Sequence, residues 1–156
     1  MIPNAQRGHI TAHIADRVLF FESTGPFDGE IVEAVIRAYR PLLQRLADGG
    51  PFAHVSTFHR SMLATPDALE AFDQLLGEWR RSGLAPIANA CVAAADIEGR
   101  SLMMPIFASV FSGFSPFRAF DRFDDAEAWA RQQLANADRG RGTSRNRGAN
   151  GSGFER

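Results

Sequence analysis

Apolar and polar positions along residues 9–25 predict two short strands that meet at Asp16 and Arg17. In the first strand Ile10, Ala12 and Ile14 alternate with polar or histidine side chains, which is the period of two that is typical of a half-buried strand. The second strand, with the sequence VLFFE, is almost uniformly apolar, as is typical of a strand covered on both faces. The chain is therefore expected to begin with a hairpin.

Two longer stretches have apolar residues spaced three and four apart, which indicates amphipathic helices. The first helix follows Asp28, a residue that can cap a helix, and runs to about Asp48. The second follows Thr65 and Pro66, a cap and a first-turn proline, and ends at Gly83. Residues 52–58, FAHVSTF, form the strand predicted between these two helices.

The C-terminal half of the domain is predicted to add two strands and two helices. Residues 86–95, PIANACVAAA, form a strand of small residues that leaves room for helices on both faces. A short helix from Pro105 to Phe111 precedes a strand at 117–123, and Asp124 with Glu127 opens the last helix in a pattern resembling a capping box. The fold class predicted is α/β, with one mostly parallel sheet of about five strands and an antiparallel N-terminal edge strand.

The order of these segments resembles the SpoIIAA-like proteins, which belong to the STAS-like fold related to lipid-binding Sec14-type domains. The resemblance covers roughly residues 8–136 and is sharpest at FRAFDRFDDAEAWARQQL, residues 117–134. It implies a STAS-like sheet with helices packed on it. Anti-sigma-factor antagonists of this fold carry a phosphorylatable serine in an Asp-Ser-Ser-Gly loop. The matching loop here, FHRSMLATPDAL, contains Ser61 and Thr65 but lacks that motif, so the phosphorylation switch is not carried over.

Charge is divided unevenly along the chain of 156 residues. All 17 basic residues are arginine, which is typical of a GC-rich bacterial genome. Residues 1–137 hold 12 arginines against 16 acidic residues, and this acidic balance argues against a nucleic-acid partner. Residues 138–156 hold five arginines against two acidic residues, with much glycine and asparagine. We predict a STAS-like domain at 1–137 and a disordered Arg/Gly-rich tail at 138–156.

Several classes of site are excluded by the residues and motifs present and by their spacing. Cys91 is the only cysteine, so the chain has no intrachain disulfide and no cysteine-based zinc site, and a reducing cytoplasm is expected. His9 and His13 lie about 13 Å apart on a strand, at ~3.3 Å per residue, which is too far to share a metal ion. Glycine-rich phosphate loops and nucleophile motifs are absent, so no metal and no cofactor is predicted. No apolar run approaches the ~20 residues of a membrane span.

One polar constellation remains, because loops at the carboxyl ends of parallel strands share one rim. The three loops are residues 23–28, 59–65 and 96–101. Of their residues, His59, Arg60, Ser61 and Thr65 are the candidates for binding a ligand or partner. A purely structural role for these residues stays open, since polar loops end strands in every α/β protein and Thr65 has a capping role.

The segment LMMPIFASVFSGFSPFRAF, residues 102–120, contains an unusual amount of apolar bulk. Its helical spacing favours core, where phenylalanine compensates for the small residues of 86–95. The core interpretation does not assign a place to Met103, Met104 and Phe114. They are expected to form either an exposed patch for a partner or a second copy, or the wall of an apolar pocket.

We therefore predict a non-catalytic STAS-like binding or regulatory module that acts through protein contacts. Two alternatives stay open. One is a carrier or sensor of a small apolar, lipid-like ligand held between the short helix and the sheet. The other is a small enzyme that uses His59, which would require a hydrogen bond between His59 and Asp28, Asp96 or Glu98.

Overall fold

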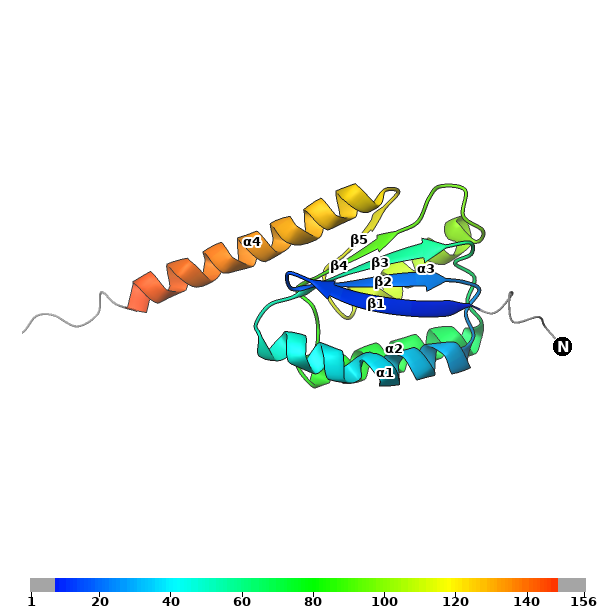
Figure 1. The fold of residues 1–156 in the computed structure, drawn as a ribbon, viewed down its shortest axis with the longest axis horizontal. Coiled ribbons are helices and arrows are strands. Elements are labelled where there is room, and N and C mark those ends of the chain that lie inside the picture. The colour runs from blue at the N-terminus through cyan, green and yellow to red at the C-terminus, as the bar shows by residue number, and fades with distance from the viewer. Residues whose placement is uncertain (1–7, 149–156) are drawn as a thin grey trace, which may run out of the picture.

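The computed structural model describes residues 8–148 and contains one five-stranded sheet with helices on both faces (Figure 1). Its strands lie in the order β1-β2-β3-β4-β5. Along the chain the elements are β1 (His9–Ala15), β2 (Val18–Thr24), α1 (Gly29–Asp48), β3 (Ala53–His59), α2 (Pro66–Arg81), β4 (Ala88–Val92), α3 (Arg100–Ser112), β5 (Phe117–Phe120) and α4 (Phe123–Gly148). The predicted succession of strands and helices is confirmed.

The first two strands form the predicted hairpin, and β1 is the antiparallel edge strand of the sheet. Asp16 and Arg17, the two turn residues, both have positive φ angles, of 48° and 67°. This backbone is that of a type I′ turn, whose twist matches the twist of the two strands. The remaining neighbours, β2–β3, β3–β4 and β4–β5, are parallel, so the expected mixed sheet is confirmed.

Helices α1, α2 and α3 cover one face of the sheet, and α4 covers the other. Strand β4 separates the two resulting cores and contributes small residues to each. Cys91 of the strand and Ala93, which directly follows it, belong to the three-helix core, whereas Ala88 and Ala90 pack with Ala130 of α4. Small side chains in β4 therefore allow helices to approach the sheet closely from both directions, as the sequence predicts.

The phenylalanine-rich segment forms α3 and β5 and is mainly core. Helix α3 begins at Arg100, five residues before the predicted start at Pro105. The ring of Phe107 stacks on Phe58 of β3 at 5.4 Å between centroids, and Phe111 stacks on Phe117 of β5 at 6.0 Å. These contacts join α3 to two strands of the sheet and confirm the core interpretation of the segment.

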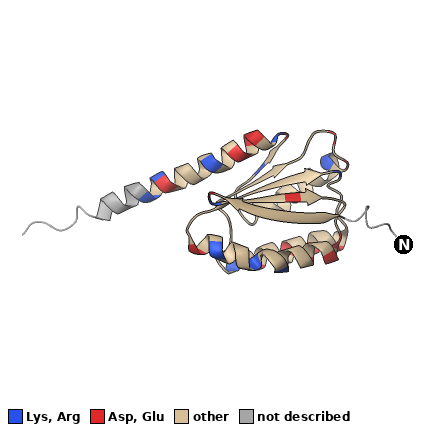
Figure 2. Ribbon diagram, in the orientation of Figure 1, with Lys and Arg blue, Asp and Glu red and all other residues tan. Residues whose placement is uncertain are grey.

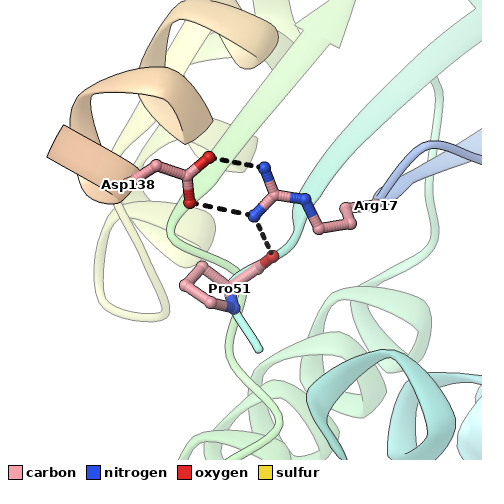
Figure 3. A network of polar contacts seen from close by, with 3 residues as sticks. All are labelled: Arg17, Pro51 and Asp138. Atoms are coloured by element: carbon pink, nitrogen blue, oxygen red, sulfur yellow. Dashed lines mark hydrogen bonds and ion pairs between the residues drawn. The ribbon is translucent and has the colours of Figure 1, made fainter. Parts of the chain in front are cut away.

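Helix α4 continues well past the predicted end of the domain and projects beyond the ends of the strands (Figure 1). Disorder from Asp138 onward is therefore wrong for residues 138–148, and residues 149–156 lie outside the described part of the chain. The prediction weighed only apolar burial. It did not include polar contacts within the helix such as the hydrogen bond from Arg139 to Asn136. Nor did it include an ion pair between Arg17 and Asp138 (Figure 3).

Charged residues are dispersed along the helices, with both signs interspersed, rather than gathered on one face (Figure 2). Most of the visible sheet carries no charge. Between residues 8 and 148, the protein has no helix with the length and apolar content needed to cross a bilayer.

Candidate functional site

The three loops predicted to share a rim do meet. The Gly25 amide donates to the His59 carbonyl at 3.2 Å, and Phe27 N–H donates to the Leu63 carbonyl at 2.8 Å. The Met62 amide donates to the Glu98 carbonyl at 2.9 Å, which brings in the third loop. Parallel strand ends thus gather the loops as the sequence predicts, but they do so through backbone bonds.

His59 lies at the end of β3 and pairs with a carboxylate that the sequence analysis did not select. Its Nε2 is 2.5 Å from Oε2 of Glu22, on the neighbouring strand β2. This carboxylate is not Asp28, Asp96 or Glu98, the partners that the enzyme alternative requires for His59. Both side chains are open to solvent, at 53% and 41% exposure, so water competes with any group they would bind.

Arg60 and Ser61 serve mainly to hold the rim together. Arg60 has a positive φ of 65°, and its Nε donates to the Gly25 carbonyl at 2.7 Å. Ser61 is fully buried, and its hydroxyl accepts a hydrogen bond from the Leu63 amide at 3.1 Å. Because the Ser61 hydroxyl is enclosed, a modifying enzyme has no access to it in the folded protein.

Thr65 is exposed and caps α2, as the sequence predicts. Its Oγ1 accepts from the Ala68 amide at 3.3 Å. A hydrogen bond from the Thr65 side chain also holds the pKa of Asp67 below its usual value. Asp67 in turn accepts from the Gly29 amide at 3.3 Å, so this cluster ties the first turns of α1 and α2 together.

The apolar candidates from the sequence lie partly in the core and partly at its surface. Met103 and Phe114 are 3% and 6% exposed and belong to the core beneath the helices, and Met104 is half-buried against it. Leu102, with 64% exposure, is instead the exposed apolar residue of this segment. The exposed-patch alternative is therefore wrong for Met103 and Phe114, because both side chains are buried in the core.

A cavity of about 50 Å³ lies between the sheet and the helices of this same face. Its walls come from β1, β2, β3 and all three covering helices, together with Phe27 of the loop after β2. The ten apolar lining residues are Ile10, Phe21, Phe27, Val35, Ile36, Phe58, Phe72, Leu76, Trp79 and Phe111. Three polar residues, Ser23, His54 and Ser56, line it from the strands.

His54 is the polar group with the most unusual surroundings in this cavity. It is 3% exposed, and its Nε2 has no hydrogen-bond partner. Burial lowers the pKa of its imidazole to about 3, so the ring is neutral at physiological pH. Orphaned buried polar atoms are uncommon in native proteins, which makes this nitrogen a candidate for contact with a bound molecule.

Sequence reasoning missed the residues of the cavity, although a signal for them exists. In the strand 52–58, His54 and Ser56 occupy alternate positions and therefore share one face. That strand is expected to be buried on both sides, so two polar side chains on one face are out of pattern. Ser23 gives no comparable signal, because it stands near the end of its strand where polar residues are ordinary.

Comparison with known proteins supports the fold. The structure is similar to the crystal structure of an uncharacterized protein of the DUF3478 family with a SpoIIAA-like fold, from Shewanella loihica PV-4. The TM-score is 0.53 at 17% sequence identity, and the match covers 83% of this chain and 98% of that one. No family model matches the chain, and no curated protein matches it. The protein therefore has a SpoIIAA-like α/β fold, as the sequence resemblance implies.

Proposed function

We propose, from this SpoIIAA-like fold, that the protein is a non-catalytic module that binds a small apolar ligand between the sheet and helices α1, α2 and α3. The observation that carries the proposal is the largely apolar cavity lined by His54, whose Nε2 has no hydrogen-bond partner. Ligand sites are typically concave and apolar with a few placed polar groups, which is the composition found here.

Packing energetics supports an occupant for this space. Protein interiors are close-packed, and side chains beside a void lose dispersion contacts on that side. The walls include six aromatic rings, among them Phe21, Phe72 and Trp79, which would recover these contacts against a ligand. A bound apolar molecule would therefore stabilise the fold as well as being held by it.

A route into the cavity is suggested by the groove between α1 and α2. Ile36 and Trp79 line both the cavity and this groove, which has a volume of about 320 Å³. Arg40 of α1 and Glu78 of α2 form an ion pair at 2.6 Å across the groove. The cavity is smaller than the roughly 300 Å³ of ordinary ligand pockets, so α1 and α2 must separate to admit a ligand of usual size.

Native mass spectrometry of protein purified from cells tests this proposal. We expect a co-purifying small-molecule mass on the wild type and on Thr24→Leu, a control on β2 that does not line the cavity. Ser23→Leu, which adds bulk to the cavity from the adjacent position, is expected to lose that mass while remaining folded. A clean apo mass for the wild type, with no saturable binding of toluene, would contradict the proposal.

A second candidate is a module that acts through protein contacts at the rim, including self-association. It is favoured by Leu102, which is 64% exposed in the first turn of α3, and by exposed Arg60 and Thr65 on the neighbouring loop. Sedimentation of the wild type and of Leu102→Glu over a range of concentrations tests the self-association form. Concentration-dependent dimers lost in Leu102→Glu would support it, and a wild-type monomer throughout would contradict it.

A further inference from the structure

His54 lines the cavity from β3, and aromatic rings surround its imidazole. Rings of Phe21, Phe52 and Phe114 lie 5.5, 5.6 and 6.3 Å from the His54 ring, between centroids. None of these neighbours accepts or donates a conventional hydrogen bond, and His54 Nε2 is left without a partner. A group that enters the cavity and reaches His54 Nε2 would therefore meet an unsatisfied hydrogen-bonding position.

Other polar side chains extend this position into a short strip across the sheet. Ser56 stands two residues further along β3 and lines the cavity with His54, and Ser23 lines it from β2. On the opposite side of His54, Asn89 of β4 is its direct partner in the strand register. Asn89 is fully buried, and neither Nδ2 nor Oδ1 of its side chain has a hydrogen-bond partner. Three unpartnered polar atoms therefore belong to His54 and its neighbour in the sheet, Asn89.

The cavity wall contains no charged side chain to balance an ion. No arginine, aspartate or glutamate is among the residues that line it, and burial keeps the imidazole of His54 neutral, with a pKa of about 3. A carboxylate or ammonium group placed here would be desolvated without a counter-charge, which is strongly unfavourable. A neutral hydroxyl carries no such cost, and it can pair with either tautomer of His54 because it both donates and accepts.

We propose that the ligand is a small neutral molecule with an aromatic or aliphatic body and one hydroxyl group, and that this hydroxyl bonds His54 Nε2. This inference rests on the proposed function, since it specifies what the cavity binds. The body of the ligand lies against the rings of the cavity and points toward Ile36 and Trp79, where the cavity borders the groove between α1 and α2.

Three probes of similar shape test the inference: p-cresol, toluene and 4-methylbenzoate, titrated into the full chain at pH 7 with binding followed by NMR. For the wild type we expect p-cresol to bind about tenfold more tightly than toluene, and 4-methylbenzoate not to bind. In His54→Phe, which keeps a ring but cannot form the bond, the preference for p-cresol over toluene should be lost. His13→Phe, at an exposed histidine of β1, is the matched control and should behave as the wild type.

The imidazole ¹⁵N resonances of wild-type His54 give a second measurement that does not depend on a variant folding. Saturation with p-cresol should shift the Nε2 resonance, and saturation with toluene should leave it nearly in place. Equal affinities for p-cresol and toluene, or an Nε2 resonance that p-cresol does not move, would overturn the inference while leaving the proposed function intact. Failure of both aromatic probes to bind would overturn the proposed function itself.

Discussion

Arg17, in the turn between β1 and β2, donates two hydrogen bonds to the carboxylate of Asp138, 121 residues later in α4 (Figure 3). The two distances are 3.2 and 2.8 Å, and the same guanidinium reaches the Pro51 carbonyl at 3.5 Å. The hydrogen bond from Arg17 holds the pKa of Asp138 below its usual value. A turn at one edge of the sheet therefore fixes the point at which α4 leaves the body of the protein.

We predict that Arg17→Ala loosens the second half of α4 without unfolding the domain. Both partners are largely exposed, so the effect on global stability is expected to be small. Native-state amide exchange should instead become faster around residues 135–141 and stay unchanged in β3. Arg131→Ala, which removes an ion pair within α4, serves as the control. Unchanged exchange around residue 138 in Arg17→Ala would show that the helix holds without this contact.

Gly25 lies where β2 and β3 end, and the close approach of their loops requires a residue without a side chain. A Cβ atom at this position would lie 2.1 Å from the Ser61 carbonyl oxygen and 2.9 Å from the ring of Phe27. We predict that Gly25→Ala lowers the free energy of unfolding by about 1–3 kcal/mol, as overpacking of a close contact does. Urea denaturation measures this directly.

Gly140 is the matched comparison for that substitution. It lies in α4, and a Cβ atom there would meet nothing within 4 Å. Gly140→Ala should leave stability unchanged or raise it by up to about 1 kcal/mol, because alanine favours helix over glycine. Similar losses in both variants would mean that the rim contact at Gly25 is not the source of the effect.

The sequence predicts those features of the fold that depend on residues close together in the chain. The period-two alternation at Ile10 and Ala12, the caps Asp28 and Thr65, and the small residues of β4 each act over a few neighbours. All of these features appear in the structure. The continuation of α4 was not predictable in the same way, because it involves Arg17 at the other end of the chain.

The residues of the candidate site are harder to predict from the sequence than the fold is, for a geometric reason. A cavity is the space that side chains from many elements fail to fill, so it depends on rotamers and helix positions as well as composition. His59 was selected because it ends a strand, and it does lie on the rim. His54, five residues earlier, lies within a strand, and its position along the chain does not mark it as a site residue. Only the structure reveals that its Nε2 has no partner.

Cys91 provides a test of how tightly the three-helix face is closed. It is fully buried in β4, and burial raises the pKa of its thiol above the usual value. Because the thiolate is the reactive form, we predict that Cys91 does not react with a thiol reagent such as DTNB in the native protein at pH 8 and reacts fully in 6 M guanidinium. Fast native labelling would show that the core opens readily at β4.

The neutral state of His54 predicts how stability depends on pH. In the unfolded chain the imidazole titrates near its ordinary value of about 6.5, whereas burial lowers the pKa in the folded protein to about 3. Below pH 6.5 the unfolded state therefore binds a proton that the folded state does not, and the free energy of unfolding falls as the pH falls. The slope from this one group approaches about 1.4 kcal/mol per pH unit.

Urea denaturation of the wild type and of His54→Phe between pH 7 and pH 5 isolates this contribution. The window lies above the range in which Asp67 and Asp138, whose carboxyl pKa values are lowered, take up protons. We expect stability to decline more steeply with falling pH in the wild type than in His54→Phe, whatever their absolute stabilities. His13→Phe, at an exposed position, should keep the wild-type slope. Parallel slopes in the wild type and His54→Phe would mean that His54 accepts a proton in the folded state, and the cavity would then be able to hold an anion.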